Sequence, residues 1–246
     1  MNIMDVRLVT QIHYYIGSYM KHTVFENAIP LDVCEYIRDF FDNNPELQIH
    51  KPNNPNVIKI NHPWRHLQDV LDPILSQYFR TNRGSGGNIY KHTNLYSLHV
   101  DSDEPTQMIN VNIPIHLEVV DPPQHLIVFD QWTDNGFGQT WYGKRKDLEN
   151  YNFDRNKKVP MSPYEDPRVY DCTEDPIDEK FYNEYLEFDN HTPELFHGLT
   201  GTAYDWRPGN MVVFNSNNLH CTGKLIGPWK MGLLMNFEGT LEELLV

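Results

Sequence analysis

The stretch NLYSLHVDSDEP, which begins at Asn94, places a histidine and an aspartate two positions apart, His99 and Asp101, after a β-prone segment. Side chains at positions i and i+2 of a strand point to the same face of a sheet, so this pair can reach one metal ion. A second pair, His116 and Glu118, competes with it. The chain has 12 histidines, so about one such pair is expected by chance. Taken alone, either pair is more simply explained as ordinary polar side chains.

A later part of the sequence adds a third histidine and a lysine. The segment RPGNMVVFNSNNLHCTG indicates a turn, a strand rich in valine and phenylalanine, a short polar loop and then His220. Lys230 follows at the head of another strand-like segment, where period-two spacing puts it on the same face as Gly232. A cation beside a residue without a side chain leaves room for a small anionic ligand, and a buried ammonium needs a counter-anion. The alternative is a lysine exposed at the end of a strand.

The first part of the chain indicates two helices. Residues 29–46 (IPLDVCEYIRDFFDNNPE) carry apolar side chains at helical spacing, with proline near the start and Asn-Asn-Pro at the end. Residues 64–79 (WRHLQDVLDPILSQYF) predict a second helix, which Pro73 should kink or split. The glycine-rich residues 81–88 (TNRGSGGN) are expected to form a loop.

From there the apolar period changes to two. Residues 107–120 (QMINVNIPIHLEVV) alternate apolar and polar side chains and predict a half-buried strand. Three more strands are expected in 125–132, 210–215 and 229–239. Helices followed by strands indicate a mainly β or α+β domain with helices packed outside. The polar face of the strand predicted in 107–120 carries Asn110 and Asn112. These side chains could bond a co-substrate or substrate if that face lines a barrel; otherwise they are solvated polar groups on the surface.

The segment 133–206 has little periodicity and is rich in acids, proline, tyrosine and asparagine. A stretch this long inside one domain is usually a lid, a binding loop or a disordered segment. We expect a single domain over 1–246 with 133–206 as a lid-like insertion, and a short helix within 176–188 (PIDEKFYNEYLEF). A solvated acidic excursion is an equal alternative.

Composition excludes several classes of function. The formal net charge of −14 makes nucleic-acid binding unexpected, because such a surface repels phosphate backbones. The three cysteines form no CxxC and indicate free thiols in a reducing compartment. No basic region followed by an apolar run opens the chain, and no apolar stretch approaches the roughly 20 residues of a membrane helix. We therefore expect a cytoplasmic protein without a signal peptide or a membrane span.

Together these residues resemble a known family. His-x-Asp, a distant histidine and a basic residue about ten positions later are similar to the motif of the Fe(II)/2-oxoglutarate-dependent oxygenases. The stretch IYKHTNLYSLHVD resembles the prolyl-4-hydroxylase-like form of that motif, with Tyr90 and Tyr96 before the histidine. Two further features are similar to the family: the segment from Pro208 and Gly209 to the distal histidine, and the N-terminal helix. The resemblance covers about Val24 to Phe237, apart from the insertion.

The resemblance implies a double-stranded β-helix, or jelly-roll, core with N-terminal helices. It implies an enzyme that binds Fe(II) and 2-oxoglutarate and uses O2 to hydroxylate an unactivated C–H bond of a small molecule or a peptide side chain, releasing succinate and CO2. Its metal ligands and catalytic residues would be His99, Asp101 and His220. The implied cofactor-binding residues are Lys230, Tyr90, Tyr96, Asn112 and Gly232, with the lysine and Tyr90 on the far carboxylate of 2-oxoglutarate.

Two departures and two alternatives qualify the resemblance. Lysine stands at 230 where arginine is commoner, and glycine stands at 232 where a small hydroxyl residue or alanine is often found. Asp101 argues against the halogenating branch, which lacks this carboxylate. A non-catalytic β-sandwich binding module has no need of all four groups, and a 2-oxoglutarate-independent cupin-type metalloenzyme would carry His-x-His, which does not occur in the chain. Substrate and oligomeric state do not follow from the sequence.

Overall fold

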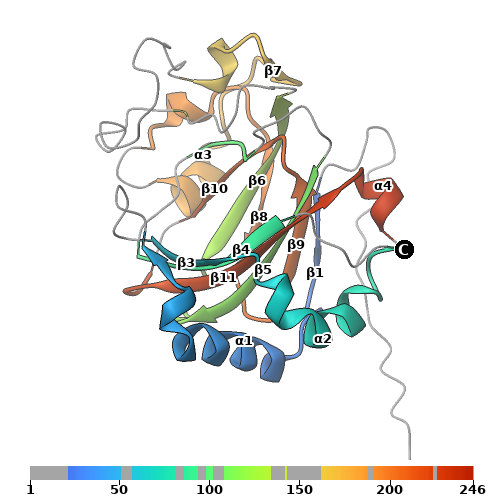
Figure 1. The fold of residues 1–246 in the computed structure, drawn as a ribbon. Helices are drawn as coiled ribbons and strands as arrows, with labels where there is room; N and C mark the ends of the chain where they lie inside the picture. Colours follow the sequence, from blue (N-terminus) through green and yellow to red (C-terminus); the bar gives the residue numbers. More distant parts are fainter. Residues whose placement is uncertain are drawn as a thin grey trace, which may run out of the picture.

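The structure, a computed structural model, describes residues 22–50, 57–80, 86–93, 98–101, 108–133, 142, 162–187, 191–223 and 226–245. Within these ranges the strands form two antiparallel sheets (Figure 1). The large sheet has seven strands in the order β1-β9-β5-β11-β4-β3-β2, and the small sheet has the order β10-β6-β7, with β8 also paired to β6. The strands are β1 (His22–Phe25), β2 (Ile49–His50), β3 (Val57–Asn61), β4 (Gly86–His92), β5 (Met108–Leu117), β6 (His125–Thr133), β7 (Val169–Tyr170), β8 (Gly201–Asp205), β9 (Met211–Asn215), β10 (Asn218–Thr222) and β11 (Lys230–Glu238).

The order in which the chain visits the two sheets defines the fold. After β4 in the large sheet, the segment at His99 pairs with β10 of the small sheet. The chain then adds β5 to the large sheet, β6 and β8 to the small sheet, β9 to the large sheet, β10 to the small sheet and β11 to the large sheet. This alternation is the double Greek key of a jelly roll. The predicted mainly β, double-stranded β-helix core with N-terminal helices is confirmed.

Two helices cover the outer face of the large sheet (Figure 1). Helix α1 (Leu31–Asn43) buries Cys34, Ile37 and Phe41, and α2 (Trp64–Leu75) buries one leucine in each turn. These side chains share one apolar core with the helix-facing residues of β5 and β11, and burial of each large one stabilises the fold by about 1.5–3 kcal/mol. Both predicted helices are confirmed. Pro73 does not split α2, because in the last turn it removes only one backbone hydrogen bond.

The strand β5 separates two environments by simple alternation. Its odd-numbered residues from Ile109 to Ile115 pack into the core beneath the helices. The residues between them, Asn110 and Asn112, therefore face the small sheet. Both asparagines are buried rather than solvated. The polar face of this strand thus lines the interior of the jelly roll.

The glycine-rich segment differs in part from the prediction of a loop. Residues 81–85 lie outside the described residues, but Gly86, Gly87 and Asn88 begin β4. Gly87 has a φ of +134°, and a Cβ there would lie 2.2 Å from the carbonyl oxygen of Leu234 on β11. Only glycine lets the two backbones approach this closely, so a composition typical of loops marks the start of a strand.

The insertion packs against the outer face of the small sheet. Its described part contains short helical turns and no long helix. An apolar cluster joins Tyr182, Leu186 and Phe196 to Ile127 and Phe129 of β6. Residues 201–205, at the end of the expected insertion, form β8 and pair with β6. Whether the segment acts as a lid stays a prediction. The elements after β6 are η3 (Pro163–Glu165), α3 (Glu179–Phe181), the π-helical turn η4 (Tyr182–Leu186) and η5 (Pro193–Phe196); η1 (Pro45–Leu47) and α4 (Leu241–Leu244) lie elsewhere.

All three cysteines are free: Cys34 and Cys221 are buried, and Cys172 is partly exposed. Cys221 packs into the cluster beneath the insertion, away from the jelly-roll interior, as strand alternation predicts. In the described part of the chain, no helix is long and apolar enough to cross a membrane.

Candidate metal centre

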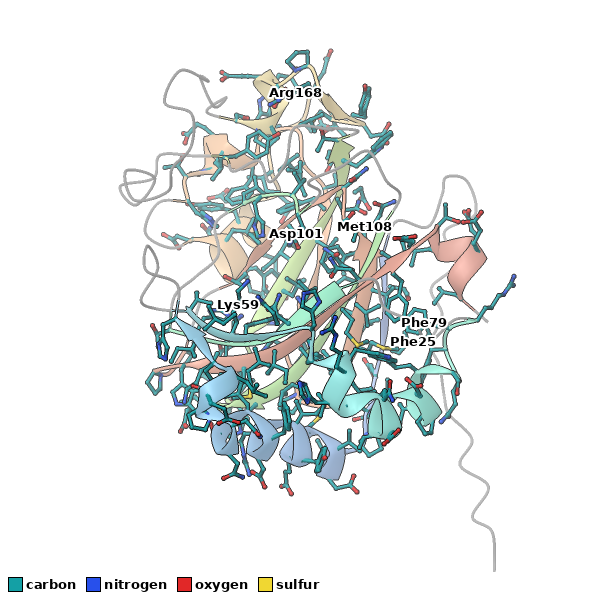
Figure 2. The ribbon with its side chains drawn as sticks, viewed as in Figure 1. Phe25, Lys59, Phe79, Asp101, Met108 and Arg168 are labelled. Carbon is teal, nitrogen blue, oxygen red and sulfur yellow. The ribbon has the colours of Figure 1, made fainter. Side chains whose placement is uncertain are left out.

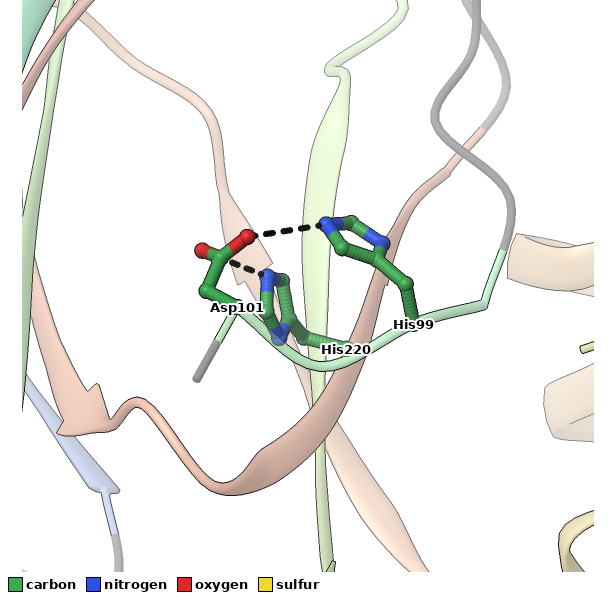
Figure 3. Close-up of side chains that lie close together, drawn as sticks. All are labelled: His99, Asp101 and His220. Carbon is green, nitrogen blue, oxygen red and sulfur yellow. Dashed lines mark ion pairs between the residues drawn. The ribbon is translucent and has the colours of Figure 1, made fainter. Parts of the chain in front are cut away.

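Three of the side chains singled out in the sequence meet in space (Figure 3). His99 Nε2 lies 3.4 Å from Asp101 Oδ1, and His220 Nε2 lies 3.3 Å from Asp101 Oδ2. The three candidate ligand atoms lie within 4.8 Å of one another, and no second cluster of this kind occurs among the described residues. Neighbouring ligands of an octahedral ion with bonds of about 2.1 Å are about 3 Å apart, so small side-chain adjustments would accommodate one ion.

The backbone places the two histidines opposite each other. His99 donates its N–H to the carbonyl of His220 at 3.0 Å, and His220 returns the bond at 2.9 Å. A residue pair that exchanges both hydrogen bonds in an antiparallel ladder projects its side chains to the same face. Asp101 is held in turn by its N–H, which donates to the carbonyl of Ser216 at 3.2 Å. Figure 2 places Asp101 between the helices at one end of the molecule and Arg168 of the insertion at the other.

The hydrogen bonds of His220 leave one ring nitrogen for a metal. Its Nδ1 lies 3.0 Å from the carbonyl oxygen of Asn218. A carbonyl oxygen only accepts, so Nδ1 carries a hydrogen, and Nε2, on the side of Asp101, is the ring nitrogen available to a metal. Metal-binding histidines commonly donate their second ring N–H to a carbonyl in this way, which fixes both tautomer and ring orientation.

Asp101 is oriented and kept ionised by its neighbours. The amide Nδ2 of Asn110, on β5, donates to Asp101 Oδ2 at 3.0 Å. Burial acts to raise the pKa of Asp101, but the imidazoles of His220 and His99 outweigh it and hold that pKa well below its usual range. The carboxylate is therefore available as an anionic ligand, and Asn110 fixes its rotation.

The competing pair does not form a comparable cluster. His116 Nε2 lies 3.8 Å from Glu118 Oε1, and both side chains are substantially exposed. The imidazole of His116 instead stacks on Trp229, with 4.8 Å between ring centroids. No third ligand group joins the pair within the described ranges. Geometry therefore favours the pair at positions 99 and 101.

Lys230 is buried inside the jelly roll. Only 1% of the residue is exposed, and its Nζ lies 4.5 Å from the centroid of the Trp206 ring. No ion pair with a carboxylate links it to any residue that the structure describes. Burial lowers the pKa of Lys230 to about 7, and the nearby Cys221 sulfur acts in the opposite direction. A buried cation with this surrounding is stabilised by an added anion.

The sequence suggested free space beside Lys230, but side chains from other elements fill that space. A Cβ on Gly232 would lie 2.5 Å from the hydroxyl of Tyr90 and 2.9 Å from Cζ2 of Trp206. Glycine at 232 therefore lets two aromatic rings close on the strand. The Tyr90 hydroxyl also donates to Oδ1 of Asn112 at 2.8 Å. Lys230, Tyr90, Asn112 and Gly232 thus lie close together. Period-two spacing had put Lys230 and Gly232 on one face, and the family resemblance added Tyr90 and Asn112.

Two sequence expectations have other outcomes. Tyr96 lies outside the described residues. Trp206, which the sequence placed at the edge of the insertion, is 2% exposed and packs between the two sheets. The signal that could have revealed it is the alternation in GTAYDW before the Arg-Pro-Gly turn, which predicts a strand continuing into the core.

A cavity lies in the insertion, outside this cluster. Its volume is about 800 Å³, and its lining includes Tyr164, Glu165, Glu179, Glu194 and His197. None of the three candidate metal ligands and neither Lys230 nor Trp206 lines it. This cavity is therefore separate from the candidate metal centre, which lies between the two sheets.

Comparison with known proteins gives a likeness of fold. No family model and no curated protein matches the sequence. Similar solved structures include SnoK, a non-heme alpha-ketoglutarate-dependent carbocyclase from nogalamycin biosynthesis, with 11% identity, 88% of this chain and 79% of that chain covered and a TM-score of 0.47. A Pseudomonas putida prolyl-4-hydroxylase has 8% identity, with 89% of this chain and 93% of that chain covered and a TM-score of 0.45. EctD from S. alaskensis, solved with 2-oxoglutarate and 5-hydroxyectoine, has 13% identity, with 89% of this chain and 72% of that chain covered and a TM-score of 0.45. Values this low do not distinguish one reaction or substrate from another.

Proposed function

We propose that this chain is an Fe(II)- and 2-oxoglutarate-dependent dioxygenase. It would hydroxylate an unactivated C–H bond of a small molecule or a peptide side chain and release succinate and CO2. The observation that carries this proposal is the presence, inside one jelly roll, of both a His-Asp-His ligand set and the buried Lys230, which has no carboxylate partner among the described residues. Two imidazoles and one carboxylate on one side of an ion are typical of non-haem Fe(II) oxygenases.

Each residue has a role that its surroundings support. His99, Asp101 and His220 would hold Fe(II), with Asn110 orienting the carboxylate. Lys230 would bind the far carboxylate of 2-oxoglutarate. When bound, the iron and 2-oxoglutarate together supply the oxidation, in which one atom of O2 enters the substrate and the other enters succinate. The protein holds its ligands, excludes water and positions one C–H bond of the substrate.

The finer assignment to the prolyl-4-hydroxylase-like branch belongs to this proposal. Its support is the position of Tyr90 beside Lys230 and Gly232, which agrees with the tyrosine spacing of that motif. The assignment does not imply a prolyl substrate, because one fold carries many substrates. The binding-module alternative leaves the buried lysine and the ionised ligand set without a purpose, and the cupin alternative lacks its second clamp histidine.

Metal-dependent binding of 2-oxoglutarate tests the proposal. Protein stripped of metal should bind one Fe(II) under anaerobic conditions. Addition of 2-oxoglutarate should then produce a visible charge-transfer absorption band. His99→Ala, Asp101→Ala and His220→Ala should each lose most iron affinity, because each removes one ligand of three. His116→Ala is the matched control and should bind iron like the wild type.

Two results would redirect the assignment. Wild-type iron affinity in all three ligand variants would place the metal site elsewhere. Iron binding without any 2-oxoglutarate binding would favour the cupin-type enzyme. If both ligands bind, a screen of amino acids, peptides and metabolites for substrate-dependent succinate formation would identify the substrate class.

A further inference from the structure

Trp206 has a hydrogen-bond donor that no described residue satisfies. The residue follows β8 directly, and its backbone N–H donates to the carbonyl of Gln124 at 2.7 Å. The indole packs between the sheets with apolar side chains of β6 and β9. Its Nε1 is buried and has no acceptor in the described part of the protein. Buried donors without a partner are rare in native proteins, so this one requires an explanation.

The unsatisfied N–H lies on the edge of the indole that borders Gly232. Cζ2 of Trp206 would be 2.9 Å from a Cβ at position 232, and the Tyr90 hydroxyl would be 2.5 Å from the same point. Nε1 and Cζ2 are bonded to the same ring carbon, so the N–H belongs to this edge. Lys230, two residues away on the same face of β11, has its Nζ 4.5 Å from the indole centroid. A phenol, an indole N–H and an ammonium therefore surround one short length of β11.

The choice of lysine makes an additional donor useful. An arginine presents a planar fork that can hold both oxygens of a carboxylate, whereas an ammonium acts as a compact charge that does not fix the plane of its partner. A carboxylate bound by Lys230 alone could rotate about the single contact. A second donor on another element would fix that rotation. The Tyr90 hydroxyl donates its hydrogen to Asn112, whereas Trp206 Nε1 is a buried donor beside Lys230 with no acceptor among the described residues.

We propose that Trp206 is a co-substrate-binding residue whose indole N–H donates to the carboxylate held by Lys230. The inference rests on the proposed function for the identity of the ligand, 2-oxoglutarate, and assigns to the site a donor from the connection between β8 and β9. Trp206 thereby makes the site selective for dicarboxylic keto acids. Gly232 is necessary because a side chain there would displace the indole edge and the Tyr90 hydroxyl together.

Nuclear magnetic resonance of the indole N–H groups gives a test that does not depend on activity. The chain has five tryptophans, so the ¹⁵N-labelled protein should give five indole signals. With Zn(II) as a diamagnetic substitute for Fe(II), 2-oxoglutarate should move one N–H proton signal downfield, and that signal should be absent from Trp206→Phe. The assignment can also be made by elimination with phenylalanine variants of Trp64, Trp132, Trp141 and Trp229, so it does not require a folded Trp206 variant.

Binding measurements separate a hydrogen bond from a general structural role. Trp206→Phe keeps an aromatic ring and should weaken 2-oxoglutarate binding roughly 10- to 100-fold, as expected for a hydrogen bond to a charged acceptor. The same substitution should leave the affinity for 2-oxobutanoate, a keto acid without the far carboxylate, within about twofold. Zn(II) affinity should be unchanged. Trp229→Phe, which alters a tryptophan beneath Lys91, is the matched control.

The outcomes distinguish this inference from the proposed function. If the wild type binds 2-oxoglutarate but the Trp206 signal stays in place and Trp206→Phe binds equally well, the inference is overturned and the proposed function stands. If Trp206→Phe loses affinity for both keto acids alike, Trp206 has only a structural role and the inference also fails. If the metal-loaded wild type binds no 2-oxoglutarate, both proposals fall.

Discussion

Removal of the Lys230 charge should weaken 2-oxoglutarate binding without affecting the metal. Lys230→Met keeps an unbranched side chain of similar length, so it changes charge more than packing. A carboxylate bound opposite this position would lose its charged partner inside the protein, where only 1% of Lys230 is exposed and solvent screening is small. Iron affinity should barely change, because Lys230 is not among the clustered ligand atoms.

The size of the effect follows from burial. Loss of one partner from a buried, charge-assisted hydrogen bond costs about 2–4 kcal/mol. At about 1.4 kcal/mol for each factor of ten, the affinity for 2-oxoglutarate should fall about 30- to 1,000-fold. Lys230→Arg should retain more affinity than Lys230→Met, although its longer planar head must fit against Trp206, whose ring already contacts the ammonium.

Calorimetry of 2-oxoglutarate binding to the Fe(II)-loaded, anaerobic protein measures the effect directly. Lys91→Met is the matched control, because Lys91 also lies over a tryptophan, with its Nζ 3.8 Å from the Trp229 ring, but is partly exposed. It should bind 2-oxoglutarate like the wild type. An unchanged affinity in Lys230→Met would refute the reasoning and place the anchor of the co-substrate elsewhere.

Three further outcomes are expected. Because burial lowers the pKa of Lys230 to about 7 and a bound carboxylate requires the charged amine, 2-oxoglutarate affinity at saturating metal should be level below about pH 6, decline through pH 7 and fall by up to about tenfold per pH unit above it; a constant affinity to about pH 9 would contradict this. Gly232→Ala, whose Cβ meets Tyr90 at 2.5 Å, should lower the free energy of unfolding in urea by about 1–3 kcal/mol, whereas Gly86→Ala, with nothing within 4 Å, should cost less than about 1 kcal/mol. Asn110→Leu should reduce metal affinity about 10- to 100-fold in competition with a chromogenic chelator, and equal losses in Asn112→Leu would show that the contact with Asp101 is not responsible.

Local periodicity made much of this fold predictable. The period of two in β5 fixed which side chains face the helices and which face the interior, because a strand has only two faces. The i, i+2 spacing likewise put His99 and Asp101 on one side. Neither pattern indicates which distant residue lies opposite His99 and Asp101. His220 was therefore predicted only from its own segment and from the family resemblance.

Contacts between distant segments account for what the sequence did not reveal. Gly232 indicated free space beside Lys230, but Tyr90 from β4 and Trp206 from the β8–β9 connection occupy it. Gly87 indicated a loop because its composition is shared by turns and by strands in close backbone contact. In both cases the deciding atom belongs to another strand, and no local pattern carries that information.

The exchange of backbone hydrogen bonds between His99 and His220 also bears on how the protein is held together. These residues belong to segments that are far apart along the chain, and an ion bound by both would close the intervening loop like a removable cross-link. A ligand that binds only the folded chain adds about 2.7 kcal/mol of stability at a concentration one hundred times its dissociation constant. An ion bound there would then also stabilise the jelly roll, and the free energy of unfolding would report what fraction of the protein carries the ion.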